Sequence, residues 1–283
     1  MATMSKFLLL GVFAVIILIL LSVFIALSVS HQKNQSKSPN NSINTTTEET
    51  GAVATEAGVA LVNKWLKLAK TDSGELSIQY IDLTDNQALG YEEKKIYEGA
   101  SVNKLITAGY LLSQFDKGAI DLRENLGDVT LQEHARLMVN QSNNNSWQTL
   151  NDRLGYANIE NFALGLGMSD FQIENNEISV HDTGIFLEKL YKGQVLTEAS
   201  KQLLYSWMRN TETEDRIPFG LPPNTVFYHK SGTFEKGIHD AAIIVNPKRP
   251  FVIIVFTNGV KDGRAIITEI TRDAWAYADS KPQ

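Results

Sequence analysis

The first fifth of the chain is a long hydrophobic run followed by a polar stretch. Residues 7–29 are apolar and uncharged, and as a helix rising 1.5 Å per residue they would reach about 34 Å, enough to cross a bilayer. We expect a membrane anchor within residues 1–30. The alternative is a cleaved signal peptide, for which Ala26-Leu27-Ser28 offers a cleavage site. Residues 31–51 are rich in Ser, Asn and Thr and cannot bury a core, which predicts a flexible linker.

From residue 52 to residue 283 the spacing of apolar residues predicts one folded domain. Helical spacing fills residues 54–70, and alternation over residues 76–83 predicts a strand, with residues 96–97 as a short second strand beside it. A thick apolar stripe predicts a helix over residues 101–115. Further helices are expected at residues 131–139, 146–154, 159–164, 182–191, 197–208 and 265–278, and further strands at residues 226–230, 241–245 and 251–256.

This order of elements predicts an α/β fold with an all-α lobe. Strands near both ends of the folded part would form a single antiparallel sheet flanked by helices, and the middle of the chain would form a mostly helical lobe beside it. A groove between two lobes is a common place for a site.

The composition of the chain argues against several kinds of site and partner. The chain has no cysteine, which excludes disulfides, thiolate metal sites and a cysteine nucleophile. The net charge of -6 and the absence of a basic cluster argue against nucleic acid as a partner. The five histidines show no paired spacing of the kind that builds a zinc site. We expect neither a metal nor a cofactor.

Three short motifs carry the candidate chemistry. In chain order they are Ser101-Val102-Asn103-Lys104, Ser142-Asn143-Asn144 and Lys230-Ser231-Gly232-Thr233. Together they supply a nucleophile, an amine that can take its proton, a hydroxyl relay and a second amine, which are the groups an acyl-serine enzyme needs.

In the first motif, Ser101 and Lys104 lie three residues apart on one helix face, so the amine can reach the hydroxyl. Ser101 also starts the helix, where free N–H groups favour an oxyanion. Taken alone, Ser-x-x-Lys also fits an exposed helix start capped by serine.

The third motif would end a strand along one wall of the groove. The N–H groups of Thr233 and Ser101 would form an oxyanion hole, while Gly232 allows the backbone close approach and Ser231 lies beside it in the same substrate-binding strand. Lys230 would attract a substrate carboxylate and, by repulsion between like charges, lower the pKa of Lys104.

The second motif lies in a polar run between two helices and could be only a turn. In the functional interpretation, Ser142 passes a proton to the leaving nitrogen, and Asn144 binds a substrate amide from the opposite wall.

With these motifs, residues 54–278 resemble the class A β-lactamases and their penicillin-recognising relatives. The resemblance implies the two-lobed serine β-lactamase fold, a catalytic domain over residues 52–283, and the family's roles for the residues of all three motifs. Asp182-Thr183 resembles the pair that closes the family's omega loop.

The chain departs from the family's pattern at three places. Asn143 replaces an aspartate, which we expect to weaken the bracing of its loop. His239 stands where many class A enzymes carry an arginine for the substrate carboxylate. The segment before Asp182 offers only Glu174 and Glu177 as the deacylating base. The alternative interpretation is that both are solvated glutamates of the loop.

These features predict a serine hydrolase acylated at Ser101 by a β-lactam or a peptidoglycan stem peptide. We expect it in the bacterial cell membrane with the domain outside the cytoplasm, or secreted if the first segment is cleaved. Two alternatives are a DD-peptidase-like penicillin-binding protein that deacylates slowly and a non-catalytic peptidoglycan-binding module.

Overall fold

The computed structural model describes residues 55–71 and 73–282. The anchor expected in residues 1–30 and the linker expected in residues 31–51 lie outside them. Within the described ranges, no helix is both long and apolar enough to cross a membrane.

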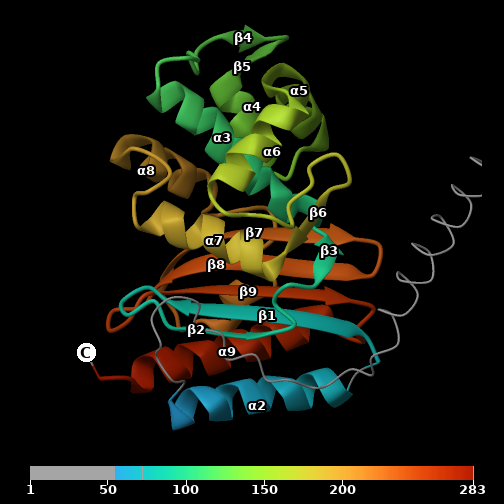
Figure 1. The fold of residues 1–283 in the computed structure, drawn as a ribbon, viewed down its shortest axis with the longest axis vertical. Coiled ribbons are helices and arrows are strands. Elements are labelled where there is room, and N and C mark those ends of the chain that lie inside the picture. The colour runs from blue at the N-terminus through green and yellow to red at the C-terminus, as the bar shows by residue number, and fades with distance from the viewer. Residues whose placement is uncertain (1–54, 72, 283) are drawn as a thin grey trace, which may run out of the picture. The chain divides into compact units, whose positions relative to one another are not determined.

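One five-stranded antiparallel sheet organises the described chain (Figure 1). Its order is β2-β1-β9-β8-β7, so strands from both ends of the folded part meet in it, as the sequence predicts. The strands are β1 (Glu75–Asp82), β2 (Ala88–Tyr91), β7 (Val226–Phe234), β8 (Gly237–Val245) and β9 (Phe251–Asn258).

The early strand pairing differs from the expectation. β1 pairs with β2, which the sequence interpretation did not include, whereas β3 (Ile96–Glu98) pairs with β6 (Glu177–Ser179) in a separate ladder. Both missed strands have four residues or fewer, too short to show a period. The pair β4 (Asn125–Leu126) and β5 (Val129–Thr130) is shorter still.

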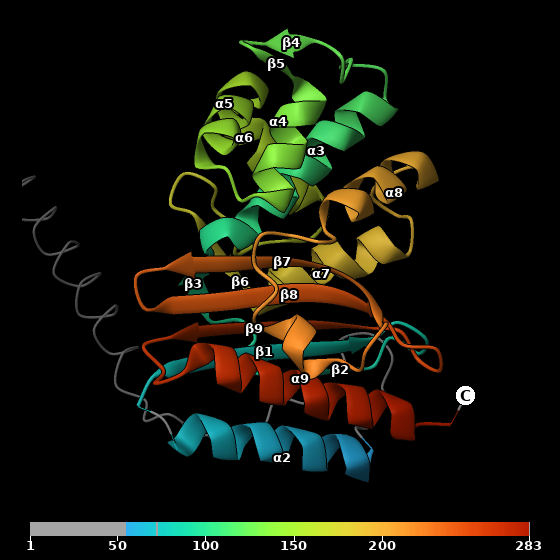
Figure 2. The ribbon, with the colours of Figure 1, turned by 180° about the vertical axis from the view of Figure 1, so that it is seen from behind.

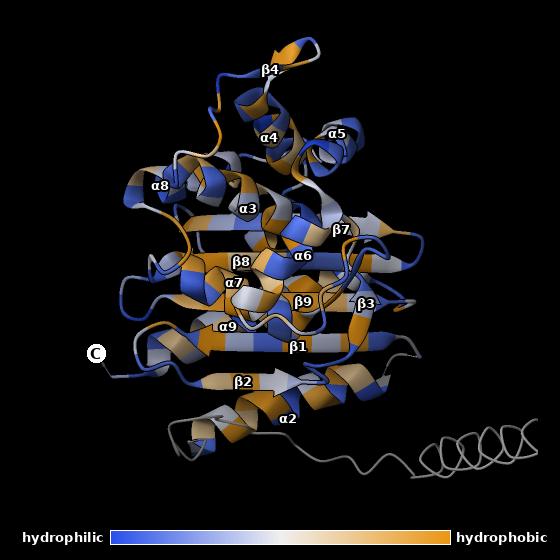
Figure 3. Cartoon of the chain, turned by 45° about the horizontal axis from the view of Figure 1, so that its top comes forward, coloured by the Kyte–Doolittle hydropathy of each residue, from blue (hydrophilic) through white to orange (hydrophobic). Residues whose placement is uncertain are grey.

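Alternation along the strands gives the sheet two hydrophobic faces. In β8, for example, Ile243 contributes to one core cluster and Ile244 to the other. Figure 3 shows β8 and β9 as mostly hydrophobic strands. Because both faces of the sheet are covered, the sequences of these strands are nearly continuous apolar runs.

Eight α-helices and two short 3₁₀ helices are described. They are α2 (Glu56–Thr71), α3 (Lys104–Asp116), α4 (Leu131–Asn140), α5 (Asn144–Leu154), α6 (Tyr156–Gly165), α7 (Val180–Tyr191), α8 (Glu198–Trp207), α9 (Gly263–Ser280), η1 (Ala100–Asn103) and η2 (Ile217–Gly220). Side chains of Thr130, Asn143, Ser179 and Thr197 cap the starts of α4, α5, α7 and α8, which fixes where those helices begin.

The helices form layers on the two faces of the sheet. Helices α2 and α9 pack together behind the sheet, and α7 covers its other face (Figures 1 and 2). The helices α3 to α6 and α8 lie beyond the edge strand β7. The short helix η1 contacts both β7 and β8, which brings the first motif against the third.

Candidate active site

The first motif forms a tight turn that leads into the helix α3. Ser101 lies in η1, and α3 begins at Lys104. Lys104 Nζ donates to Ser101 Oγ at 2.9 Å, and also to the carbonyl oxygen of Ser142 and to Asn144 Oδ1, each at 2.6 Å. One amine therefore joins Ser101 to the second motif.

Lys104 is almost completely buried, and its three hydrogen-bond acceptors are neutral oxygens. Burial lowers the pKa of Lys104 to about 8, because a charged ammonium loses solvation there. The sequence interpretation expected a lowered pKa but gave repulsion from Lys230 as the cause. The structure assigns the shift to burial instead.

Lys230 approaches the same site from β7. Its Nζ donates to Ser142 Oγ and, at 3.1 Å, to the carbonyl oxygen of Ser231. Burial, and then repulsion from Lys104, lower the pKa of Lys230 to about 7. Ser142 thus lies between the two amines. Its carbonyl oxygen accepts from Lys104, and its hydroxyl oxygen accepts from Lys230.

The loop with the second motif holds Ser142 in a left-handed conformation, with φ of 54°. Asn143 Oδ1 accepts from Ser146 N at 2.8 Å and caps α5. Asparagine and aspartate are equally good caps, so we withdraw the expectation that Asn143 weakens this loop. Asn144 is exposed, and its Oδ1 accepts from Lys104 Nζ.

The strand β7 passes very close to residues 98–103, which contain the candidate nucleophile Ser101 and are called the nucleophile turn below. A Cβ atom on Gly232 would lie 3.0 Å from Ser101 N and 2.8 Å from Ala100 Cβ, so only glycine fits there without a shift. Ala100 itself has a φ of 50°, a left-handed conformation that costs a non-glycine residue about 1–2 kcal/mol. The close approach brings the backbone of Gly232, directly before Thr233, beside Ser101 N.

Arg216, which the sequence interpretation did not single out, lies under the third motif. It is 2% exposed, and its Nη1 donates to the carbonyl oxygens of Gly232 and His239, each at 2.6 Å. Its Nη2 donates to Thr233 Oγ1 at 2.5 Å. A guanidinium fork suits such multiple acceptors. The one sequence signal is an Asp215-Arg216 pair in a loop, which is too common to identify it.

His239 does not present a cation to the groove. Its side chain is buried, and its Nε2 is hydrogen-bonded to the carbonyl oxygen of Glu98 at 2.9 Å. Burial lowers the pKa of His239 to about 4, so the imidazole is neutral at pH 7. The cation beside the third motif is the buried guanidinium of Arg216.

A second buried histidine lies on β7 next to Lys230. His229 Nδ1 donates to Asp240 Oδ1 at 3.0 Å, and both side chains are fully buried. Burial alone would lower the pKa of His229, but the charge and hydrogen bond of Asp240, with Glu214, outweigh it and raise the pKa to about 9. The strand that carries Lys230 is therefore anchored by a charged pair.

The two candidate deacylating glutamates are not joined to this network. Glu174 is exposed and Glu177 is half-buried. Within residues 55–71 and 73–282, neither carboxylate makes a hydrogen bond or ion pair with Ser101, Lys104 or Ser142. The loop residue that reaches the nucleophile turn is Asn176, which the sequence interpretation did not single out.

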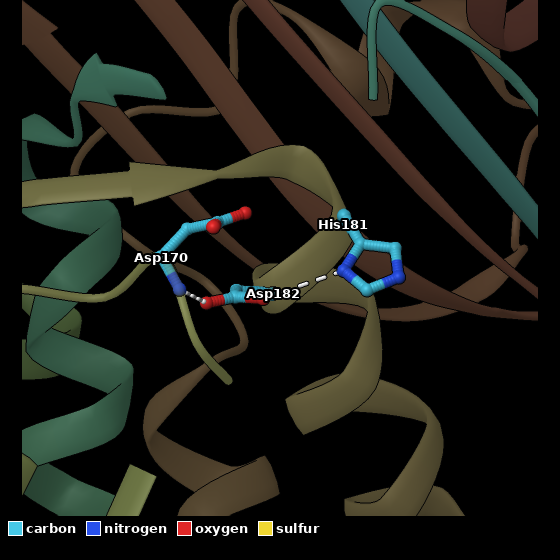
Figure 4. Close-up of side chains that lie close together, drawn as sticks. All are labelled: Asp170, His181 and Asp182. Atoms are coloured by element: carbon cyan, nitrogen blue, oxygen red, sulfur yellow. Dashed lines mark hydrogen bonds and ion pairs between the residues drawn. The ribbon is translucent and has the colours of Figure 1, made fainter. Parts of the chain in front are cut away.

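The start of the same loop is braced to α7 (Figure 4). Asp182 Oδ2 accepts from Asp170 N at 2.7 Å, and Asp182 Oδ1 pairs with His181 Nδ1 at 3.3 Å. The ligand atoms of these three residues lie within 4.8 Å of one another. Because both oxygens of Asp182 already have partners, we interpret the cluster as a brace that closes the loop.

Comparison with known proteins agrees with this geometry. The model of the beta-lactamase enzyme family matches residues 60–278. Beta-lactamase 3 of Bacillus cereus is 27% identical over 243 residues, which cover 74% of this chain and 77% of the relative.

Two solved structures share the fold. A mutant of PBP-A, determined as an acyl-enzyme complex with penicillin G, has a TM-score of 0.74 at 20% identity, covering 79% of this chain and 97% of its own. The last common ancestor of Gram-negative bacteria beta-lactamase class A (GNCA4) has a TM-score of 0.72 at 23% identity, covering 77% of this chain and 98% of its own. The expected two-lobed fold and the expected relationship are confirmed, and this chain belongs to the beta-lactamase enzyme family, as a serine enzyme related to class A.

Proposed function

We propose that this protein is a serine hydrolase whose Ser101 is acylated by β-lactams and which hydrolyses the amide bond of the lactam ring. The observation that carries this proposal is the 2.9 Å hydrogen bond between Lys104 Nζ and Ser101 Oγ, within an amine pair that also holds Ser142. Membership of the family supports the same activity.

In the acylation step, the neutral amine of Lys104 accepts the proton of Ser101 Oγ as the oxygen attacks the lactam carbonyl carbon. The N–H groups of Ser101 and Thr233 stabilise the oxyanion that forms. When the ring C–N bond breaks, Ser142 passes a proton to the leaving nitrogen and regains one from Lys230, whose Nζ donates to the Ser142 hydroxyl. The product is an ester of Ser101.

The substrate carboxylate would bind where β7 ends. Thr233 is exposed there, and Arg216 holds its hydroxyl oxygen from beneath, so the hydroxyl hydrogen is free to point at a carboxylate. Lys230 and Arg216 supply positive charge to this corner, which favours an anionic ligand. Asn144, exposed on the opposite wall, is placed to bind the amide of the substrate side chain.

Deacylation is the slower step in this proposal. A water molecule must be activated at the ester, yet the loop offers the amide of Asn176 at the nucleophile turn instead of a carboxylate. This observation favours a second candidate function, a penicillin-binding protein of cell-wall metabolism that acylates quickly and releases its product slowly.

The location of the protein is part of the proposal. The apolar run of residues 7–29 and the polar stretch that follows support a single-pass anchor with the catalytic domain outside the cytoplasm. Peptidoglycan stem peptides and β-lactams are both present on that side of the membrane.

Steady-state and single-turnover assays distinguish the candidates. Continuous hydrolysis of a chromogenic cephalosporin supports the hydrolase. A covalent adduct that forms once and then persists supports the penicillin-binding protein. Stem-peptide binding without any adduct would support the non-catalytic module and overturn the acyl-serine proposal.

A further inference from the structure

The loop between α6 and β6 ends in a short hairpin, which lies beside the nucleophile turn. Gln172 and Glu177 exchange both backbone hydrogen bonds, at 2.8 and 2.9 Å, so the tip holds only the four residues between them. The last of these, Asn176, has a φ of 54°, a left-handed conformation that asparagine tolerates better than most residues. The hairpin therefore presents Asn176 in a fixed orientation.

Four contacts of Asn176 fall on residues 98–103, the segment that contains the nucleophile. Its backbone oxygen accepts from Gly99 N at 2.7 Å, and its Oδ1 accepts from Asn103 Nδ2 at 2.6 Å. Its Nδ2 donates to Glu98 Oε1 and, at 3.3 Å, to the carbonyl oxygen of Ala100. A single side chain thus holds both ends of the turn around Ser101.

The turn that these contacts hold is one the chain does not adopt readily. Ala100, directly before Ser101, is a non-glycine residue in the left-handed region. Glu98 Oε2 accepts from Ala100 N at 3.2 Å. The N–H of Ala100 is therefore bonded to Glu98, and its carbonyl oxygen is bonded to Asn176. On its other side the turn rests against Gly232 of β7.

The charges around Glu98 explain why an amide suits position 176. Glu98 is half-buried, and its neighbours include Glu235 and, opposite it in the ladder, Glu177. The ring of His239, against the carbonyl oxygen of Glu98, is neutral. The carboxylate of Glu98 needs a hydrogen-bond donor at position 176, and the same side chain must accept from Asn103. The carboxamide of Asn176 does both without adding another negative charge.

We propose that Asn176 is a positioning residue that, together with Glu98, holds Ala100 in its left-handed conformation and so aims Ser101 at Lys104 and at the oxyanion hole. The inference rests on the proposed function for its kinetic consequence. In this account the loop serves the nucleophile through an amide clamp, and its effect is on the formation of the ester as well as on its hydrolysis.

Three variants of the full chain test the clamp. Asn176→Gly keeps the left-handed backbone and removes the side chain, Asn176→Asp keeps the shape but faces Glu98 with a second carboxylate, and Asn175→Gly is the control, since the exposed Asn175 side chain contacts Gln172. We expect the second-order rate of acylation by a fluorescent penicillin to fall by about 10–10²-fold in both Asn176 variants. The control should remain within about twofold of the wild type.

A reciprocal variant separates positioning from simple loss of structure. In Glu98→Gln/Asn176→Asp the donor and acceptor between the two side chains are exchanged, so the hydrogen bond can form again with opposite polarity. We expect the double variant to be acylated faster than Asn176→Asp alone. If each residue only stabilised the fold, the losses of acylation caused by Glu98→Gln and Asn176→Asp would add in free energy, and the double variant would be slower than Asn176→Asp.

Crystal structures of the same variants give a readout that needs no substrate. We expect Ala100 to leave the left-handed region in Asn176→Asp and to keep it in Asn175→Gly. If the wild type forms no adduct, the proposed function fails. The conformation of Ala100 in the variants still tests whether Asn176 holds it in the left-handed region. Acylation at the wild-type rate by both Asn176 variants, with Ala100 unmoved, would overturn the inference.

Discussion

The ammonium of Lys104 lies 2.9 Å from Ser101 Oγ, and its other hydrogen bonds go to neutral oxygens of the second motif. No carboxylate in the described part of the chain pairs with it. Because burial without a counter-charge favours the neutral amine, the environment of Lys104 suits a base that takes the proton of Ser101.

A first prediction concerns pH. Since burial lowers the pKa of Lys104 to about 8, the fraction of neutral amine rises as pH increases through that value, and the acylation rate at saturating penicillin should rise with it. Lys104→Ala should slow acylation by about 10²–10⁴-fold and remove this step from the profile. Lys117→Ala, an exposed change just beyond the same helix, is the control. A wild-type rate that is constant across pH 8 would exclude Lys104 as the base.

A second prediction concerns the substrate carboxylate. Arg216 donates to Thr233 Oγ1 and places a positive charge next to it, so Arg216→Ala should weaken binding of a penicillin more than binding of its methyl ester. The ratio of half-saturating concentrations for acid and ester measures this. Arg264→Ala, which removes an exposed partner of Asp215, should leave the ratio unchanged. If Arg216→Ala affects acid and ester equally, the residue has only a structural role.

A third prediction concerns stability. The pKa of His229 is raised from 6.5 to about 9, so its protonated form stabilises the fold fully below pH 6.5, and this contribution is lost as pH rises through about 9. The shift corresponds to at most about 3 kcal/mol. Urea unfolding of the wild type and of His229→Gln should therefore show a larger difference below pH 6.5 than above pH 9. An equal difference at both would mean that the pair with Asp240 is not ionic.

A fourth prediction concerns the loop glutamates. Neither Glu174 nor Glu177 is joined to the nucleophile by a hydrogen bond, so we expect Glu174→Gln and Glu177→Gln to leave the lifetime of the acyl-enzyme unchanged. The measurement is the decay of the adduct by intact mass after excess penicillin is removed. A longer lifetime in either variant, by roughly the 10²–10⁴-fold typical of a lost general base, would identify that residue as the deacylating base.

The sequence predicted the architecture well where the apolar pattern was long. The helix over residues 101–115 corresponds to α3, except that its first three residues belong to the 3₁₀ helix η1, and the strand over residues 251–256 corresponds to β9, which continues to Asn258. The three motifs also meet in space, and motif residues such as Ser101 and Lys104 are local enough to be placed from spacing alone.

The sequence could not predict contacts that depend on long-range packing. Arg216 and Gly232 are brought together by the fold, with no periodic signal at Arg216. Asn176 looks like an ordinary turn residue, because asparagine is common in turns, and its role follows only from the pairing of β3 with β6. The cause of the low pKa of Lys104 likewise depends on burial, which spacing does not reveal.

The most direct test of the acyl-serine account is intact-mass spectrometry of the full-length wild type and Ser101→Ala after incubation with benzylpenicillin at a series of times. The account predicts that the wild type gains the mass of one penicillin, that peptide mapping places it on Ser101, and that it decays more slowly than it forms. Ser101→Ala should gain no mass while remaining folded. An adduct of equal extent in Ser101→Ala, or no adduct on the wild type at any time, would contradict the account.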